Sequence, residues 1–413
     1  MNFNKTGRLA ESLVTGLGHW GGLLLVTAAG LGVASLLTAC NQISGTLTVD
    51  FVYVTSAKAA GPDNYGEVDV FEINSESGRM RQIPTSPFPS GGRNPVAEAV
   101  AADKSTLYVV NRDDNTIVQF TIGNDGKLYP QNTVNTPGIF PMATAVSGKN
   151  LFVADTFEPL PTCSPAAPCS GSVAGWPIKA DNSLDTDHPY VNASISASYW
   201  PLTVPGSSDV ITPTAMTATA SNLFVTAYDA TANTGYMFTF TIGSGALSPL
   251  NGGVPTPAGK HPSSIVVDPA GAFVYITDLS SNDVLAFSVT SSGLTPAGSP
   301  AKTGNQPAAM VIDATGKLAY VANSEDSTIS AYHVLNGTLT PITTAPVDTQ
   351  PVAIGIDPAK NQFLFTANFL GNTVSGFEID ANMGTVLDSQ FSPYAANANP
   401  TAVAAIPHGA VAK

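Results

Sequence analysis

Three residues in this sequence have side chains that could carry out hydrolysis. A histidine titrates near neutral pH, so His261 could act as the general base for attack on a lactone. Arg93 and Arg112 could polarise a carbonyl group, or hold a carboxylate or phosphate. Each has a plainer interpretation, because such a histidine often bonds only a neighbouring carbonyl. Arg112 could equally form a solvated salt bridge with Asp113 or Asp114.

His261 directly precedes a proline, and the same X-Pro step recurs along the chain. The residues before these prolines are Asn94, Phe140, Thr212, His261, Gln306, Gln350 and Asn399. The intervals between successive prolines are 46, 72, 49, 45, 44 and 49 residues. A period of about 45 residues indicates a repeat whose copies must stack to bury their apolar surface.

One period contains four short predicted strands, seen most plainly in residues 306–341. Runs rich in Val, Ile, Tyr and Thr alternate there with turn residues, and Asn336-Gly337 suits a two-residue hairpin. The second strand of the unit recurs as FVYVTS (51–56), LYVVN (107–111), LFVAD (151–155), LFVTAYD (223–229), FVYITD (273–278), LAYVAN (318–323) and FLFTAN (363–368). Four strands per period predict an all-β fold, a seven-bladed β-propeller over residues 50–410.

The first blade lacks an X-Pro strand of its own, because none precedes the segment 51–56. Residues 400–406, PTAVAAI, follow the last complete unit. We therefore expect this C-terminal strand to join the N-terminal blade. Closing the ring in this way removes two exposed sheet edges.

The recurring YVxN second strand, the X-Pro first strand and the G-x-L-x-P hairpin resemble the YVTN and lactonase family of seven-bladed propellers. The resemblance covers roughly residues 51–406. That family includes 6-phosphogluconolactonase-like enzymes and the fungal carboxymuconate cyclase. Its lactonizing members use His, Arg and Glu in the central funnel, and the nearest match is Lys260-His261-Pro262. No motif places the matching Arg and Glu.

The resemblance also implies where a site would lie. In this family the first strand of each blade starts at the open face, so the residues before the prolines would ring the central tunnel. The second strands end at that face and would form an outer ring that includes Arg112, Asp155, Asp229, Asp278, Asn323 and Asn368.

Amides and carboxylates that converge on a funnel suit a small polar or sugar-like ligand. The predicted ligand-binding positions are Asn94, Asp155, Asp229, Asp278, Gln306, Asn323, Gln350, Asn368 and Asn399. The alternative is that these side chains only cap strand ends and bind water in the tunnel.

Residues 1–39 have the order of a secretory signal peptide. Lys5 and Arg8 precede an apolar run at residues 23–37. The run ends in Leu-Thr-Ala-Cys40, which resembles the bacterial lipobox, in which the cysteine is diacylated. A retained transmembrane helix is the alternative.

A lipidated Cys40 would make residues 40–49 a short tether that keeps the propeller close to the membrane. By the same resemblance, Asn41 after the cysteine favours export to the outer membrane of the cell envelope. We expect the membrane to be one partner, and an envelope protein or a small ligand to be another.

The third repeat is the longest and carries two unusual segments. Cys163 and Cys169 close a proline-rich stretch, and an exported chain meets an oxidising compartment, so we predict a disulfide between them. Asp181, Asp185 and Asp187 could bind calcium through carboxylate oxygens. Their spacing is not that of an EF-hand, so a solvated turn is the preferred interpretation and no metal site is predicted.

The formal net charge is −14, and removal of Lys5, Arg8 and Glu11 with the signal leaves about −15. Such a chain has no basic stripe with which to bind nucleic acid. It also contains no G-x-S-x-G elbow, H-E-x-x-H or Walker loop. We expect a monomer without a cofactor.

Two functions remain from different classes. The first is a membrane-tethered binding propeller that presents its polar funnel to a ligand or partner. The second is a lactonase with His261 as base and Arg93 or Arg112 as electrophile. The incomplete catalytic set and the strongly negative charge, which would repel a sugar phosphate, favour the first.

Overall fold

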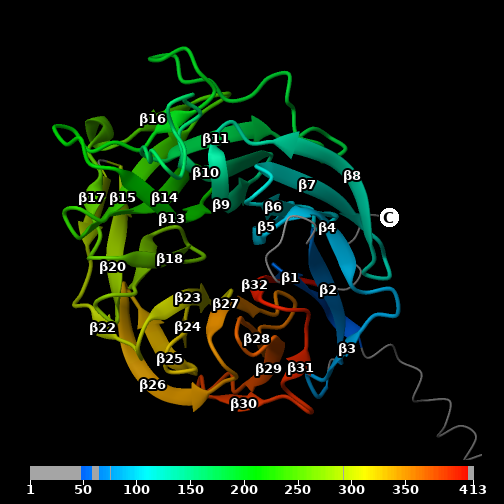
Figure 1. Ribbon diagram of the computed structural model, residues 1–413. Coiled ribbons are helices and arrows are strands. Elements are labelled where there is room, and N and C mark those ends of the chain that lie inside the picture. Colours follow the sequence, from blue (N-terminus) through cyan, green and yellow to red (C-terminus); the bar gives the residue numbers. More distant parts are fainter. Residues whose placement is uncertain (1–47, 58–64, 75, 292, 408–413) are drawn as a thin grey trace, which may run out of the picture. The chain divides into compact units, whose positions relative to one another are not determined.

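Seven four-stranded antiparallel sheets surround a central opening in the computed structural model, which describes residues 48–57, 65–74, 76–291 and 293–407 (Figure 1). The predicted seven-bladed propeller is therefore confirmed. The signal peptide 1–39 and the lipidation site Cys40 lie outside the described residues. None of the helices in the described part of the chain has the length and apolar character of a membrane span.

The blades are numbered along the chain, and each contributes one inner strand to the tunnel wall. The inner strands are β32 (Pro400–Pro407), β5 (Pro95–Val100), β9 (Ile139–Ser147), β13 (Ile211–Ala218), β18 (Pro262–Val267), β23 (Pro307–Ile312) and β27 (Pro351–Ile356). The second strands are β1 (Thr48–Ser56), β6 (Thr106–Asn111), β10 (Asn150–Phe157), β14 (Asn222–Asp229), β19 (Phe273–Asp278), β24 (Leu318–Asn323) and β28 (Phe363–Asn368).

Two further strands complete each blade toward the rim. The third strands are β2 (Tyr65–Asn74), β7 (Thr116–Ile122), β11 (Ser172–Pro177), β15 (Thr234–Ile242), β20 (Asp283–Thr290), β25 (Thr328–Leu335) and β29 (Thr373–Ile379). The outer strands are β3 (Met80–Gln82), β8 (Leu128–Asn135), β12 (Trp200–Pro201), β16 (Leu247–Pro249), β21 (Gly293–Pro296), β26 (Thr338–Pro346) and β30 (Val386–Asp388).

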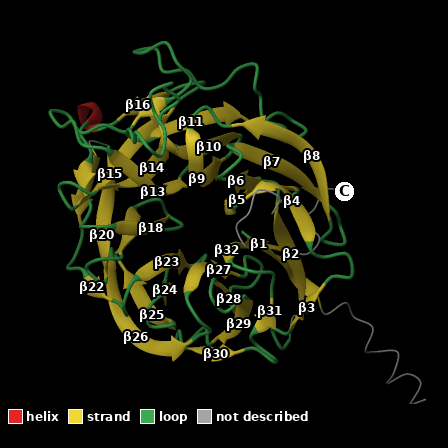
Figure 2. Cartoon of the chain, in the orientation of Figure 1, coloured by secondary structure: helices red, strands yellow, loops and turns green. Residues whose placement is uncertain are grey.

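Short additional segments pair with four of the third strands. They are β4 (Phe88–Arg93), β17 (Thr256–Pro257), β22 (Ala301–Lys302) and β31 (Tyr394–Ala395). A single 3-10 turn, η1 (Asn251–Gly253), is the helical element of the described residues (Figure 2). The scarcity of helix follows from the sequence, in which short β-branched and aromatic runs alternate with turn residues.

The ring is closed as predicted, because β32 from the C-terminus pairs with β1 in blade 1. Ile406 lies opposite Phe51, and Val403 lies opposite Val54. The inner strands of neighbouring blades also contact one another all the way around the tunnel. The arrangement leaves neither end of the propeller with a free inner edge.

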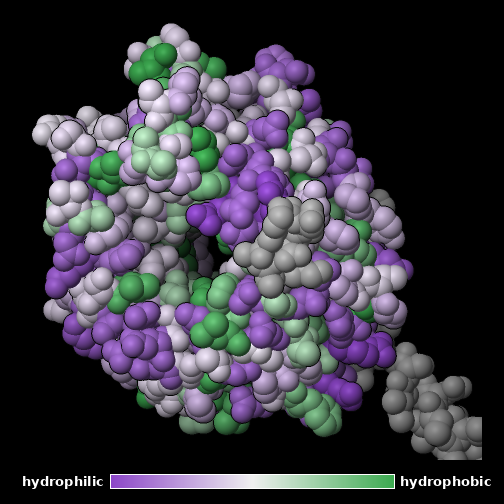
Figure 3. Space-filling view, in the orientation of Figure 1, coloured by the Kyte–Doolittle hydropathy of each residue, from purple (hydrophilic) through white to green (hydrophobic). Residues whose placement is uncertain are grey.

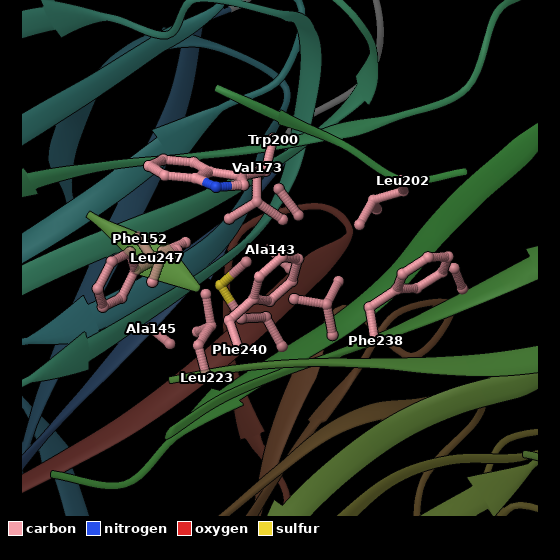
Figure 4. Close-up of a cluster of buried hydrophobic side chains, with 14 of the residues drawn as sticks. Ala143, Ala145, Phe152, Val173, Trp200, Leu202, Leu223, Phe238, Phe240 and Leu247 are labelled. Carbon is pink, nitrogen blue, oxygen red and sulfur yellow. The ribbon is translucent and has the colours of Figure 1, made fainter. Parts of the chain in front are cut away.

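Apolar side chains fill the contacts between blades. Among the described residues, seven clusters of buried side chains lie one at each contact between neighbouring blades. Figure 4 shows the cluster between blades 3 and 4, where Trp200 and Phe152 face Phe238, Phe240 and Leu247. Each blade therefore depends on its neighbours to bury both faces, which is the physical reason for the repeat.

The two unusual segments of blade 3 lie at opposite ends of β11. The loop 158–171, which holds the disulfide Cys163–Cys169, precedes β11. The acidic turn follows β11, and Val191 beyond it donates its N–H to Gly245 of the next blade. Only the disulfide loop is thus on the side of the propeller where the inner strands begin.

Candidate functional site

The residues before the seven prolines lie where the inner strands begin, and we call this ring of seven positions the mouth. None of the seven side chains is buried. The space-filling view shows the opening in the middle of the ring, with hydrophilic residues along part of its edge (Figure 3). Five members have a left-handed backbone, namely Asn94 (φ 51), Phe140 (φ 57), Gln306 (φ 52), Gln350 (φ 58) and Asn399 (φ 57).

Side chains of the preceding blade hold most of these left-handed residues in place. Asn282 Oδ1 accepts the backbone N–H of Gln306 at 2.9 Å, and Asn372 Oδ1 accepts that of Asn399 at 2.9 Å. Ser327 Oγ accepts the N–H of Gln350 at 3.3 Å. The mouth is therefore preorganised, because the backbone of one blade is bonded to the blade before it.

The amide side chains of the mouth differ in whether they form hydrogen bonds within the protein. Asn94 Nδ2 lies 3.4 Å from Asp113 Oδ1, and Asn399 Nδ2 donates to the carbonyl of Phe369 at 3.3 Å. The side chains of Gln306 and Gln350 make no hydrogen bond to the described part of the chain. These two glutamines are the mouth amides best placed to bind a ligand.

His261 belongs to blade 5 and stacks on Tyr228 of blade 4. The two ring centroids are 4.1 Å apart, and the ring planes differ by 9°. Burial against this neighbour lowers the pKa of His261, while the charge of Asp278 acts in the opposite direction. The imidazole is therefore mostly neutral at pH 7, as a general base would need to be.

The two arginines lie near the contact between blades 1 and 2, because Arg93 ends β4 beside blade 1 and Arg112 follows β6 of blade 2, and both make side-chain contacts. Arg93 Nε lies 2.6 Å from Asp114 Oδ1, and this hydrogen-bonded carboxylate raises the pKa of Arg93. The guanidinium carbon of Arg112 lies 4.7 Å from the centre of the Phe140 ring, and its Nη1 is 3.8 Å from Asp113 Oδ1. Arg112 is the less restrained of the two, because its contact with Asp113 is long.

The structure separates the predicted catalytic residues into two groups. Arg93 and Arg112 flank β5 and β6 of blade 2, whereas His261 precedes β18 of blade 5. Figure 1 places β5 and β18 on opposite sides of the central opening. A ligand that contacts both groups would have to span the mouth.

The predicted outer ring needs corrections in blades 4 and 2. In blade 4, Pro213 pairs with Ala227, so Asp229 lies two residues beyond the equivalent position, at the end of β14. In blade 2, Pro95 pairs with Asn111, as Pro262 pairs with Asp278 and Pro307 with Asn323, so Asn111 rather than Arg112 ends the second strand. Arg112 is the first residue of the following turn. The shift explains why the arginine side chain reaches Phe140 instead of lying within its own sheet.

The strand-end residues are buried and bonded within the fold. The predicted members Asp155, Asp229, Asp278, Asn323 and Asn368 are all at most 1% exposed. Asn323 and Asn368 each donate to a Thr and a Ser of the adjacent third strand. Asp229 accepts the N–H groups of Thr231 and Ala232. These contacts stabilise strand ends and turns beneath the mouth.

Glu98 is a tunnel-wall residue that the motif analysis missed. It is the one charged residue in the seven inner strands, where the equivalent positions include Met216 and Met310. Thr55 Oγ1 donates to Glu98 Oε2 at 2.5 Å, and Oε1 is buried without a partner among the described residues. Burial raises the pKa of Glu98 to about 8, so the carboxyl is mostly protonated at pH 7.

The acidic turn of blade 3 is held by its own side chains and by blade 2, because Asn182 Nδ2 donates to Asp103 and Ser105. Asp181 accepts hydrogen bonds from the N–H and hydroxyl of Ser183, and Asp185 faces His188 at 3.1 Å and Lys179 at 3.5 Å. Within residues 48–407, apart from the undescribed gaps, no group of three or more His, Cys, Asp or Glu could hold a metal ion. These partners favour a solvated turn.

Two of the cavities among the described residues lie on the rim, apart from the mouth. One of about 450 Å³ runs between blades 3 and 4 and is lined by Trp200, Leu250 and Val254. Another of about 510 Å³ lies between blades 5 and 6 beside Lys302 and Tyr332. Neither includes a residue before one of the seven prolines.

Comparison with known proteins agrees with this architecture. The sequence matches the family described as "Lactonase, 7-bladed beta-propeller" over residues 64–157 and 169–405. The unmatched stretch between these ranges falls in the disulfide loop of blade 3. No curated protein is significantly similar in sequence.

Solved structures of similar fold cover nearly the whole propeller. A candidate 6-phosphogluconolactonase from Bacteroides uniformis has a TM-score of 0.68 at 17% identity, covering 87% of this chain and 100% of its own. A periplasmic gluconolactonase from Pseudomonas aeruginosa has a TM-score of 0.65 at 19% identity, covering 86% and 99%. At these identities the likeness concerns the fold alone.

Proposed function

The chain belongs to the lactonase family of seven-bladed β-propellers, and on that premise we propose that it binds a small polar, sugar-like ligand at the mouth of its tunnel. We further propose that Cys40 tethers it to the cell envelope. The observation that carries the binding proposal is the ring of accessible polar side chains on backbones fixed by bonds between blades. Preformed sites of this kind lose little entropy when a ligand binds.

The chemistry of the mouth suits hydroxyl groups. Gln306 and Gln350 each offer an amide donor and an amide acceptor that make no hydrogen bond to the residues that the structure describes. They sit before the inner strands of adjacent blades, 6 and 7, so one ligand could contact both. The names of the fold relatives, a 6-phosphogluconolactonase and a gluconolactonase, support a sugar acid or its lactone as the kind of molecule to test first.

Hydrolysis of a sugar lactone is the alternative, because the family is named for that activity. It would need a base and an oxyanion donor on the same carbonyl group. The strand β18, which follows His261, lies across the opening from β5, which follows Arg93 and Asn94, and Arg93 is held by Asp114 (Figure 1). This separation supports binding over catalysis as the function of the mouth.

Calorimetry with D-gluconate, glucose and D-glucono-1,5-lactone, together with a lactone hydrolysis assay, tests the proposal. We expect one of these probes to bind and none to be hydrolysed above the spontaneous rate. A double change of Gln306→Ala and Gln350→Ala should weaken binding at least about tenfold, the effect of losing roughly one to two hydrogen bonds. The matched control is Gln131→Ala on the outer strand β8.

Two results would overturn the proposal in different ways. Hydrolysis that disappears in His261→Ala and Arg112→Ala would establish the lactonase instead. Equal affinity of the double variant and the Gln131→Ala control would place the ligand away from the mouth.

A further inference from the structure

His261 is held differently from the four mouth residues whose backbone N–H bonds a side chain of the preceding blade, namely Phe140, Gln306, Gln350 and Asn399. At the corresponding places in blades 6 and 1, an asparagine four residues after the end of the preceding second strand accepts the backbone N–H. These are Asn282 for Gln306 and Asn372 for Asn399. The equivalent residue before His261 is Asn233, which also has a left-handed backbone (φ 50).

Asn233 bonds a tyrosine instead of the mouth backbone. Its Oδ1 accepts the hydroxyl of Tyr228 at 3.2 Å. That tyrosine ring is the one that stacks on His261 at 4.1 Å. The side chain of blade 4 that contacts His261 at the mouth is therefore Tyr228, whereas in blades 6 and 1 an asparagine of the preceding blade bonds the mouth backbone directly.

The backbone of His261 is held by Asp278 of its own blade. Asp278 Oδ1 accepts the N–H of His261 at 3.2 Å, and Oδ2 accepts the N–H of Lys260 at 2.5 Å. Oδ1 also accepts the N–H groups of Ser280 and Ser281, each at 3.0 Å. The carboxylate is fully buried, so these charge-assisted bonds fix the His261 segment against β19.

Gly259 allows this close approach. Its φ of 82° lies in the left-handed region, and a Cβ atom there would come within 2.1 Å of Asp278 Oδ2. A side chain at this position would therefore displace the carboxylate that holds His261. The glycine, the aspartate and the tyrosine form one local arrangement around the imidazole.

We propose that Tyr228 and Asp278 are positioning residues that present the His261 ring to the mouth with both of its nitrogens left free for a hydroxyl group of the ligand. Neither nitrogen has a hydrogen-bond partner in the described part of the chain. A neutral imidazole has one donor and one acceptor, which a hydroxyl group can satisfy in either sense. The ligand part of this inference rests on the proposed function, whereas the positioning part does not.

The nearby charges give the two positioning residues opposite effects on His261. Tyr228 contributes to burial of the ring, which lowers the pKa of His261, and Asp278 contributes a negative charge that raises it. Lys260, the other charged neighbour in the segment, is exposed. Loss of the Tyr228 ring should therefore raise the pKa of His261, and loss of the Asp278 charge should lower it. A role in folding alone would not predict these two opposite shifts.

Histidine titration by NMR tests the positioning, with the His261 signal assigned from the His261→Asn variant. Tyr228→Ala should raise the pKa of His261, whereas Asp278→Asn should lower it. Tyr228→Phe keeps the stacked ring and should leave the pKa close to that of the parent protein. Tyr129→Ala, which removes a half-exposed tyrosine from β8, is the control for tyrosine loss elsewhere.

An unchanged His261 pKa in Tyr228→Ala would overturn the inference. Asp278→Asn could fail to fold because it sits beneath the mouth, and in that case the two tyrosine variants decide the question alone. A pKa that moves equally in Tyr228→Ala and Tyr129→Ala would also overturn it.

Affinity for the probes separates this inference from the proposed function. If His261 accepts or donates one hydrogen bond to the ligand, Tyr228→Ala should weaken binding about tenfold while Tyr129→Ala does not. Opposite shifts of the His261 pKa in Tyr228→Ala and Asp278→Asn, with no binding of any probe, would support the positioning role of these two residues. The same result would refute the proposed ligand. Binding that is insensitive to Tyr228→Ala would keep the proposed function and refute the role of His261 in it.

Discussion

The Oδ1 atom of Asn115 in blade 2 accepts the backbone N–H of Phe140 in blade 3, at a distance of 2.7 Å. Both residues have positive φ angles, of 54° and 57°. A bulky residue such as phenylalanine rarely adopts this conformation, so the bond offsets an unfavourable local backbone. It also fixes the aromatic ring over which Arg112 lies.

Replacement of Asn115 by glycine should isolate the contribution of this bond. Glycine keeps the positive φ without strain, so the main loss is the hydrogen bond across the interface. We expect the free energy of unfolding to fall by about 1 to 3 kcal/mol, because the Phe140 N–H is left without its acceptor. Urea denaturation measures the change.

The control for that variant is Asn336→Gly. Asn336 also has a positive φ, of 47°, but its side chain makes no hydrogen bond to the described residues. The Asn336→Gly variant therefore measures the loss of stability that comes from the greater conformational entropy of a glycine in the unfolded chain. Equal destabilisation by the two changes would contradict a role for the bond between blades.

Lipidation at Cys40 is tested by Cys40→Ser. If the sequence Leu-Thr-Ala-Cys is a lipobox, the serine variant should not incorporate labelled fatty acid and should be released from the membrane fraction. The parent protein, expressed in the same cells, provides the comparison. Labelled fatty acid on the serine variant would rule out this site of attachment.

The sequence was sufficient to predict the propeller, because the elements that define it are local. A proline is the first or third residue of each inner strand, and a run such as LAYVAN forms the buried second strand. Prolines cannot donate to a neighbouring strand, which confines them to strand starts and bulges. The closing strand also followed from sequence, since residues 51–56 had no preceding partner.

The mouth was predicted less well, because its contacts join residues that are distant in sequence. The predicted outer ring contained Arg112 where the structure has Asn111. Only the pairing with Pro95 shows which of the two residues ends the strand. The stacking of Tyr228 on His261 crosses from one blade to the next, and no local pattern encodes it. Glu98 could have been found, because a lone charge in the apolar strand PVAEAV is unusual.

Truncation after Ser392 tests the closure of the ring. The deletion removes β32, whose Ile406 is fully buried opposite Phe51 of β1, and also the short strand β31 of blade 7. Blade 1 would lose its inner strand and blade 7 would lose one neighbour. Unfolding should therefore begin at a lower temperature and extend over a broader range of temperature. Circular dichroism melting compares the two proteins, and identical cooperative curves would contradict the closure.

The last prediction concerns Glu98 and the pH dependence of stability. Burial raises the pKa of Glu98 from 4.5 to about 8, and the hydrogen bond from Thr55 only partly opposes this shift. Between these two values the folded protein keeps a proton that the unfolded chain has released. Stability should therefore fall as pH rises through this window, by up to about 1.4 kcal/mol per pH unit for one proton, and the loss should be complete above pH 8.

Glu98→Gln should remove this part of the pH dependence, because glutamine is neutral and can still accept the hydroxyl of Thr55. Urea denaturation at pH 5, 6, 7 and 8 should give a shallower loss of stability than in the parent protein. Glu378→Gln, at an exposed position on β29, should leave the slope unchanged. Parallel curves for Glu98→Gln and the parent would mean that Glu98 is already ionised in the folded protein. In that case the unpaired oxygen in the tunnel wall would carry a buried charge, and its replacement by glutamine should stabilise the fold equally at every pH in the series.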